Sequence, residues 1–125
     1  MNENKLREQI CVLATSIFDR GLTHGSTGNI SVRLDDNNIL VTPSGSSFGR
    51  LDPKQIVKVT KSGEIIGSKT PTKELPLHQA FYETRGMKSG AVVHLHSSYS
   101  VALSMLPGIN EDNVLPSYTP YSVML

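Results

Sequence analysis

The sequence predicts a single layered domain of the α/β or α+β class over residues 1–125. Three observations favour this class: an amphipathic N-terminal helix, a series of short apolar strands separated by turns, and a later alternation of helix, strand and helix. The chain is long enough to bury a hydrophobic core. Its apolar and charged fractions are ordinary for a globular protein.

The first element is an amphipathic helix, because apolar residues recur at helical spacing and can pack on a sheet. They are Leu6, Ile10, Leu13, Ala14 and Ile17. Gly21 suits the position that ends this helix. Cys11, the only cysteine, lies on the apolar face. We expect it to be a buried apolar side chain, which suits a reducing compartment.

The next elements are short strands joined by turns. Alternating apolar residues over 30–34 and the apolar run 39–41 flank a turn at residues 35–38, which predicts a hairpin. A short helical turn is expected at Asp52–Pro53, because Asp is a good N-cap and Pro fits the first helical position. Strands over 56–60 and 64–66 follow.

A second helix is expected from about Glu74 to Arg85. Thr72 can cap it, and Pro76 is tolerated only in its first turn. The apolar run over residues 91–96 then predicts a buried strand. Ser97 or Ser98 can cap an apolar helix that continues to Leu106.

The motif His94-Leu95-His96 at the end of that strand is the most informative part of the chain. Side chains two positions apart on a strand share a face, so the two imidazoles can offer nitrogen ligands to one metal ion. The alternative is two surface or core histidines with satisfied hydrogen bonds. Glu74 would complete a set suited to zinc or a similar divalent ion. Taken alone, Glu74 is a favourable charge at a helix N-terminus.

We expect structural roles, rather than metal binding, for the two other histidines, since His24 lies in a loop and His78 lies one helical turn after Glu74. Loops rich in glycine, serine and threonine suggest a phosphate site, because backbone N–H groups and hydroxyls can converge on an anion. The candidates are Gly28, Asn29, Ser44, Gly45 and Thr72, with Lys73 adding a charge. Loops of this composition are more often simple turns, and neither the P-loop nor the dinucleotide fingerprint is matched.

Bulk properties exclude several partners. The net charge is +1 with no basic stretch, which argues against nucleic acid and anionic membrane surfaces as partners. The charged N-terminus lacks the apolar core of a signal peptide, and no apolar run approaches the length of a transmembrane helix. We therefore expect a cytoplasmic protein.

Four ordered motifs resemble the class II aldolase family of the fuculose-phosphate aldolase and adducin type. They are Thr-Gly-Asn-Ile-Ser at 27–31, Thr-Pro-Ser-Gly at 42–45, Lys-Glu at 73–74 and His-Leu-His at 94–96. The resemblance implies a layered α/β/α domain with a central, mainly antiparallel sheet, and a homotetramer. It favours members that decarboxylate 3-oxo-tetronate 4-phosphate over sugar-phosphate aldolases or epimerases. A non-enzymatic, adducin-like interaction domain or an inactive fragment is the remaining alternative.

The resemblance also implies roles for the candidate residues. Zinc would be held by Glu74, His94 and His96, with Glu74 also serving as acid and base. Phosphate would be bound by the pairs Gly28–Asn29, Ser44–Gly45 and Thr72–Lys73. Fuculose-type aldolases carry two serines at the last pair, so Thr72–Lys73 departs from their pattern.

The end of the chain departs from the family pattern as well. The family supplies a further metal-binding histidine, and no histidine follows His96. The chain ends in a strand-like run, residues 121–125, with no turn or cap after it. We therefore expect a C-terminally truncated domain.

Overall fold

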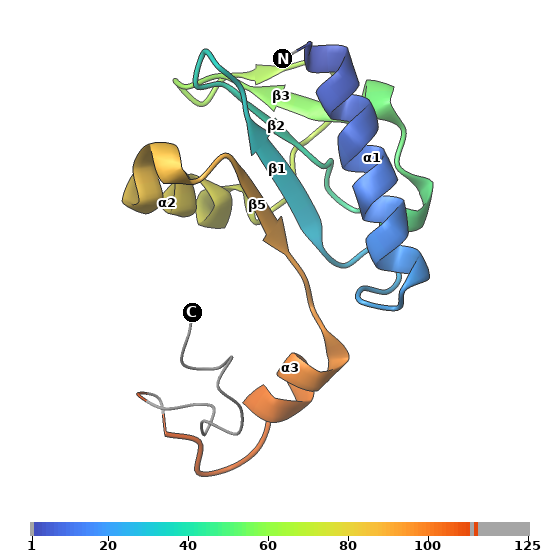
Figure 1. Cartoon of the computed structure of the whole chain (residues 1–125), viewed down its shortest axis with the longest axis vertical. Helices are drawn as coiled ribbons and strands as arrows, with labels where there is room; N and C mark the ends of the chain where they lie inside the picture. Colours follow the sequence, from blue (N-terminus) through green and yellow to red (C-terminus); the bar gives the residue numbers. More distant parts are fainter. Residues whose placement is uncertain (1, 111, 113–125) are drawn as a thin grey trace.

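The computed structural model describes residues 2–110 and 112. Its centre is a sheet in the order β4-β3-β2-β1-β5, in which each neighbouring pair is antiparallel (Figure 1). The strands are β1 (Asn29–Arg33), β2 (Ile39–Val41), β3 (Val57–Val59), β4 (Ile65–Ile66) and β5 (Ala91–His94). The predicted hairpin and the two strands after it are therefore confirmed.

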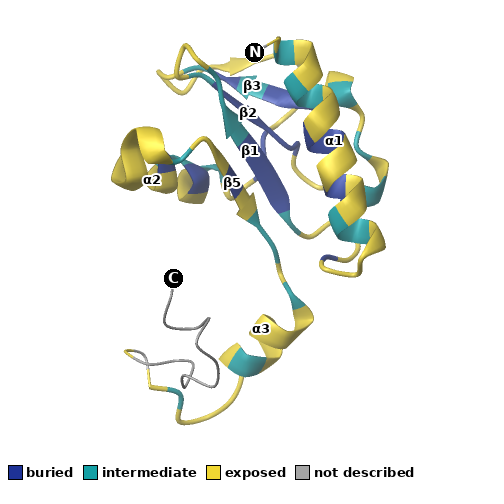
Figure 2. Cartoon of the chain, in the orientation of Figure 1, coloured by how far each residue is buried: buried dark blue, intermediate teal, exposed yellow. Residues whose placement is uncertain are grey.

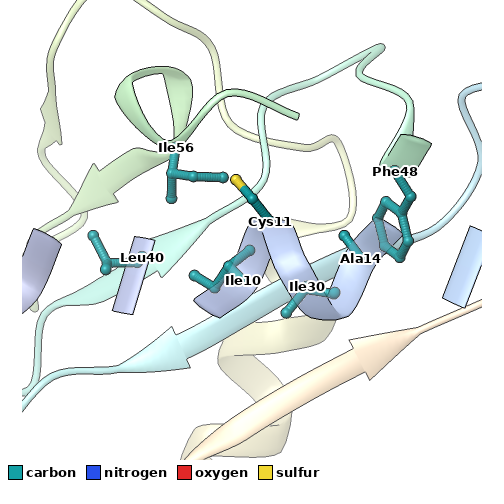
Figure 3. Packing of buried hydrophobic residues seen from close by; sticks show 7 residues of the cluster. All are labelled: Ile10, Cys11, Ala14, Ile30, Leu40, Phe48 and Ile56. Atoms are coloured by element: carbon teal, nitrogen blue, oxygen red, sulfur yellow. The ribbon is translucent and has the colours of Figure 1, made fainter. Parts of the chain in front are cut away.

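Helix α1 (Glu3–Asp19) covers one face of the sheet. Asn2 caps it by accepting the N–H of Asn4, and Gly21, with a φ of 69°, follows its end as expected. The core beneath it contains Ile10, Cys11, Ala14, Ile30, Leu40, Phe48 and Ile56 (Figure 3). Leu13 was expected on the apolar face but is 60% exposed, because the buried stripe is shifted toward Cys11 and Ala14.

Helix α2 (Leu75–Arg85) covers the opposite face, which confirms the layered α/β/α arrangement (Figure 1). The second core cluster contains Ile39, Val41, Val57, Val59, Tyr82 and Val92. Pro76 lies in the first turn, as required. The N-cap residue is Glu74 rather than the expected Thr72, although the Thr72 hydroxyl accepts the Glu74 N–H over 3.3 Å just before the helix.

The segment between β2 and β3 contains two short 3₁₀ turns, which are η1 (Phe48–Arg50) and η2 (Pro53–Gln55). The second is the turn predicted at Asp52–Pro53, and the Asp52 carboxylate accepts the N–H of Lys54.

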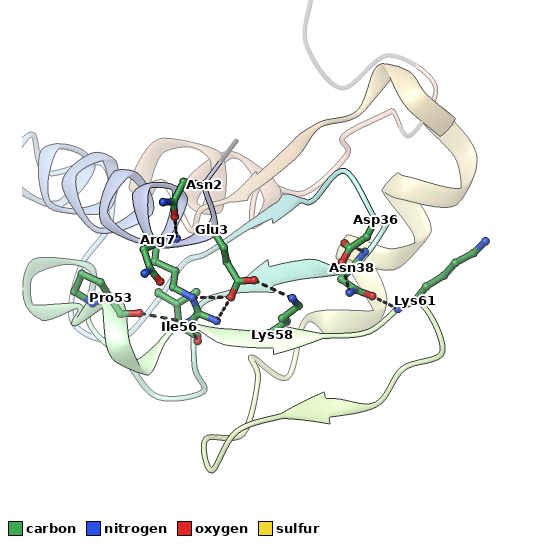
Figure 4. Close-up of polar contacts among 10 residues, drawn as sticks. Asn2, Glu3, Arg7, Asp36, Asn38, Pro53, Ile56, Lys58 and Lys61 are labelled. Carbon is green, nitrogen blue, oxygen red and sulfur yellow. Dashed lines mark hydrogen bonds and ion pairs between the residues drawn. The ribbon is translucent and has the colours of Figure 1, made fainter.

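Figure 4 shows the polar contacts between the start of α1 and β3: the Glu3 carboxylate lies 2.8 Å from both Arg7 and Lys58. The sheet and α1 are thus joined by polar as well as apolar contacts.

Strand β5 differs from the prediction of a buried strand, because it lies at an edge of the sheet. Val92 packs under α2, whereas Val93 on the other face is 53% exposed. In Figure 2, β5 is accordingly coloured partly as buried and partly as exposed. After a 3₁₀ turn, η3 (Gly86–Lys88), and β5, the chain forms α3 (Ser98–Ser104), capped by Ser97. This helix ends two residues before the expected Leu106. The predicted run at 121–125 lies outside the described residues.

Candidate active site

The antiparallel pairing gathers the predicted site segments at one end of the sheet. The start of β1 lies beside the ends of β2 and β5, and Asn29 is paired with His94. Thr42, directly after β2, donates its N–H to the Ile30 carbonyl over 3.0 Å and accepts the Ile30 N–H at its hydroxyl over 3.2 Å. The first and second candidate loops are therefore neighbours.

The third candidate segment joins them through backbone contacts. Pro43 and Pro71 form an antiparallel bridge, and the Ser44 N–H donates to the Thr70 carbonyl over 2.9 Å. Thr72 donates its N–H to the Thr42 carbonyl over 3.1 Å. This antiparallel register places Thr42 beside Thr72 and Ser44 beside Thr70, so the second and third candidate segments are neighbours immediately before α2. Lys73, Ser44 and Gly45 are exposed, whereas Thr72 is buried.

Gly28 marks the tightest point of this arrangement. Its φ is 83°, a conformation that side chains rarely adopt. A Cβ here would lie 3.0 Å from the Thr23 hydroxyl oxygen and 3.3 Å from both the His94 carbonyl oxygen and the Phe48 ring. The loop can therefore approach the end of β5 only with glycine at this position.

The two histidines lie side by side, as the spacing predicted. The ring centroids of His94 and His96 are 4.9 Å apart, with His94 half-buried and His96 exposed. Glu74 is exposed at the start of α2. Within residues 2–110 and 112, no group of three or more His, Cys, Asp or Glu side chains is arranged to hold a metal. The donor types suit zinc, but in this conformation only the imidazole pair is assembled.

A buried chain of hydrogen bonds supports His94 from behind. Asn29 Oδ1 lies 3.3 Å from Nδ1 of His94 and 2.5 Å from Nε2 of His78. Ser31 Oγ lies 2.6 Å from Nδ1 of His78 and 2.7 Å from the Tyr82 hydroxyl. All of these side chains except His94 are buried. The network therefore links the face of α2 to the end of β5.

The charge state of His78 fixes the directions of these bonds. Burial, aided by nearby His94 and opposed by Glu74, lowers the pKa of His78 from 6.5 to about 4, so the ring is neutral near pH 7. A carbonyl oxygen only accepts, so Nε2–H of His78 donates to Asn29 and its Nδ1 accepts from Ser31. Burial likewise raises the pKa of Tyr82, which keeps its hydroxyl protonated and able to donate to Ser31.

A separate hollow of about 730 Å³ lies toward the opposite edge of the sheet, between the start of α1, η2 and the end of β4. None of the predicted site residues lines it. Its lining mixes acidic, basic and apolar side chains. Volume alone thus does not locate the site that the sequence motifs indicate.

The arrangement of strands, loops and helices recurs in known proteins. Residues 8–125 match the model of the Class II Aldolase and Adducin N-terminal domain. The chain belongs to this family.

Members of the class II aldolase and adducin family align over nearly the whole chain. A 3-oxo-tetronate 4-phosphate decarboxylase of Escherichia coli O6:H1 is 47% identical over 122 residues, which are 98% of this chain and 57% of that protein. The L-fuculose phosphate aldolase of Escherichia coli K12 is 36% identical over 85% of this chain and 48% of that protein. The crystal structure of YgbL from Escherichia coli, described as a candidate aldolase, epimerase or decarboxylase, superposes with a TM-score of 0.89 at 44% identity. That match covers 98% of this chain and 58% of YgbL, so the chain spans 48–58% of the length of these relatives.

Sequence reasoning missed three residues of the hydrogen-bond network at the candidate site. Ser31, His78 and Tyr82 were given no part in the site, yet they form the network behind His94. A signal was present, because positions 78 and 82 share a helical face and that face also carries the apolar Leu75. Polar side chains on a face that packs against a sheet need partners there.

Proposed function

We propose that the protein is a divalent-metal-dependent carbon–carbon lyase that decarboxylates a 3-oxo-tetronate 4-phosphate. The observation that carries this proposal is the convergence of three phosphate-type loop segments beside the His94–His96 pair, at one end of the sheet. The names of the relatives supply the substrate class. The described helices themselves include none long and apolar enough to cross a bilayer.

Phosphate binding would fall to the loops. The residues are Gly28 and Asn29, Ser44 and Gly45, and Thr72 and Lys73. Gly28 lets the backbone pass close to the end of β5, and the exposed Lys73 ammonium supplies a positive charge. Thr72 accepts the Glu74 N–H over 3.3 Å, which leaves its own hydroxyl proton for a substrate oxygen.

Zn²⁺, or another divalent ion, would be held by His94, His96 and Glu74. The imidazole pair is already assembled, and Glu74, exposed at the start of α2, would supply the carboxylate ligand. When bound, the ion would act as a Lewis acid on the 3-oxo group and neutralise the negative charge that develops during bond cleavage. The network through Asn29 leaves Nε2 of His94 available for this contact.

The reaction itself requires one bond cleavage and one proton transfer. The bond between C1 and C2 breaks, carbon dioxide leaves, and its electron pair forms an enediolate over C2 and C3. Protonation at C2 then gives dihydroxyacetone phosphate. We propose that the Glu74 carboxyl group delivers this proton, because it lies exposed at the helix start beside the phosphate loops.

An aldolase or epimerase acting on a fuculose-type phosphate is the second candidate, favoured by the 36% identity to the Escherichia coli aldolase. A decarboxylase should release carbon dioxide and dihydroxyacetone phosphate in equal amounts from 3-oxo-tetronate 4-phosphate. An aldolase should instead release an aldehyde and dihydroxyacetone phosphate from fuculose 1-phosphate. Both substrates are given to the zinc-loaded protein, and the absence of both product pairs would favour an interaction domain without turnover.

We further propose that the whole protein is a cytoplasmic homotetramer. The exposed apolar side chains on and just after α3 support subunit contacts, since Tyr99 is 90% exposed and Met105 is 79% exposed. Light scattering of the purified protein tests the assembly. A mass four times that of the subunit is expected, and a monomer would contradict it.

A further inference from the structure

The hydrogen bonds behind the site define a single direction of donation. Tyr82 donates to Ser31, Ser31 donates to Nδ1 of His78, and Nε2–H of His78 donates to Asn29 Oδ1. Asn29 Oδ1 also lies 3.3 Å from Nδ1 of His94, and an oxygen that only accepts requires a proton on that nitrogen.

We propose that His78 is a positioning residue that acts through Asn29 to hold His94 as its Nδ1–H tautomer. The short bond from His78 keeps the Asn29 carbonyl oxygen, rather than its amide nitrogen, directed at His94. His94 then carries its lone pair on Nε2. His78 touches no ion or substrate itself, since its ring is fully buried and both nitrogens are bonded within the protein.

The consequence for metal binding rests on the proposed function. A histidine ligand whose second nitrogen is bonded to an oxygen is fixed in tautomer and orientation, and loss of such a partner typically costs about 10–100-fold in metal affinity. Asn29 was predicted as a phosphate ligand. The geometry adds a role for its carbonyl oxygen and leaves its amide nitrogen for substrate.

The tautomers can be read directly by NMR. Long-range ¹⁵N–¹H spectra of the ¹⁵N-labelled, metal-free protein at pH 7.5 distinguish protonated from bare ring nitrogens. We expect His94 protonated at Nδ1 and bare at Nε2, and His78 with the opposite pattern. An Nε2–H tautomer of His94, or a mixture of both forms, overturns the proposal. This measurement needs no variant, so a folding defect cannot obscure it.

Variants then test the link between His78 and His94. Asn29→Leu and His78→Phe remove one partner each, and both should give mixed His94 tautomers and zinc binding weaker by about 10–100-fold. Asn29→Asp retains an acceptor oxygen and should keep the Nδ1–H tautomer. Gln79→Ala, on the same helix but outside the network, should match the parent protein. Equal zinc affinity and an unchanged tautomer in Asn29→Leu would contradict the proposal.

The two proposals fail in different ways. If His94 has the expected tautomer but calorimetry with zinc alone shows no binding that depends on His94 and His96, the metal site of the proposed function is wrong and the positioning contact stands. If zinc binds through the pair but the tautomer is Nε2–H, the positioning role is wrong and the metal site stands.

Discussion

Replacing Gly28 by alanine should destabilise the protein through two separable effects. The backbone φ of 83° costs an L-residue about 1–2 kcal/mol. The new Cβ would also lie 3.0 Å from the Thr23 hydroxyl and 3.3 Å from the His94 carbonyl, and such overpacking costs about 1–3 kcal/mol. We therefore expect a total loss of about 2–5 kcal/mol, a large share of the roughly 5–15 kcal/mol that stabilises a typical domain.

Gly63 provides the matched control. Its φ is 87°, but a Cβ added there would meet no atom within 4 Å, so Gly63→Ala carries only the backbone cost of about 1–2 kcal/mol. Urea unfolding monitored by circular dichroism gives both free energies. Gly28→Ala should be the less stable variant by about 1–3 kcal/mol. Equal losses in the two variants would show that the loop around Gly28 is not tightly packed.

Three further predictions concern titration, packing and surface charge. The folded state holds the pKa of His78 at about 4, below the unfolded value of 6.5, so only the unfolded state takes up this proton as the pH falls from 6.5 to 4. This contribution to the free energy of unfolding is complete above pH 6.5, and about 3 kcal/mol of it is lost by pH 4. Urea titrations at a series of pH values should show that the unfolding free energy of His78→Gln falls less steeply below pH 6.5 than that of the parent protein. Equal slopes in the two proteins would refute His78 as the titrating group. Leu40→Ala should cost about 2–5 kcal/mol because Leu40 is fully buried, whereas Leu13→Ala at the exposed margin of α1 should cost under about 1 kcal/mol by the same assay. Glu3→Gln should cost less than about 1 kcal/mol, since its bonds to Arg7 and Lys58 are partly exposed, and the loss should shrink in 1 M salt; a loss that is independent of salt would argue against an electrostatic origin.

The elements that the sequence predicted well are those with local signals. The periodicity of α1, the hairpin turn before Ile39, and the Asp52–Pro53 cap depend on neighbouring residues, and all three are confirmed. The start of α2 was placed only approximately: the helix begins at Leu75 with Glu74 as its N-cap, and Thr72 before it pairs with Thr42 across the bridge of the two loops.

Burial was harder to predict than secondary structure. The run Ala-Val-Val before His94 has the composition of a strand buried on both faces, yet β5 lies at the sheet edge with only its α2 side covered. Strand order depends on pairings far apart in sequence, such as Asn29 with His94. Periodicity contains no such information.

In the candidate site, too, features set by neighbouring residues were predictable and features set by distant contacts were not. The adjacency of His94 and His96 was predicted from strand alternation and is confirmed, although β5 ends at His94 and His96 lies in the segment after it. The network of Ser31, His78 and Tyr82 needed the tertiary structure, because it joins β1 to α2 across 47 and 51 residues. The roles of the metal and phosphate residues remain predictions.

A crystal of the protein grown with zinc and inorganic phosphate would test the central claim most directly. Anomalous scattering at the zinc edge locates the ion without reference to activity. The account predicts zinc bonded to Nε2 of His94 and to His96, with phosphate between the loops at Gly28, Gly45 and Lys73. Zinc bound only in the hollow near Glu3 and Asp52, with both histidines free of metal, would contradict it.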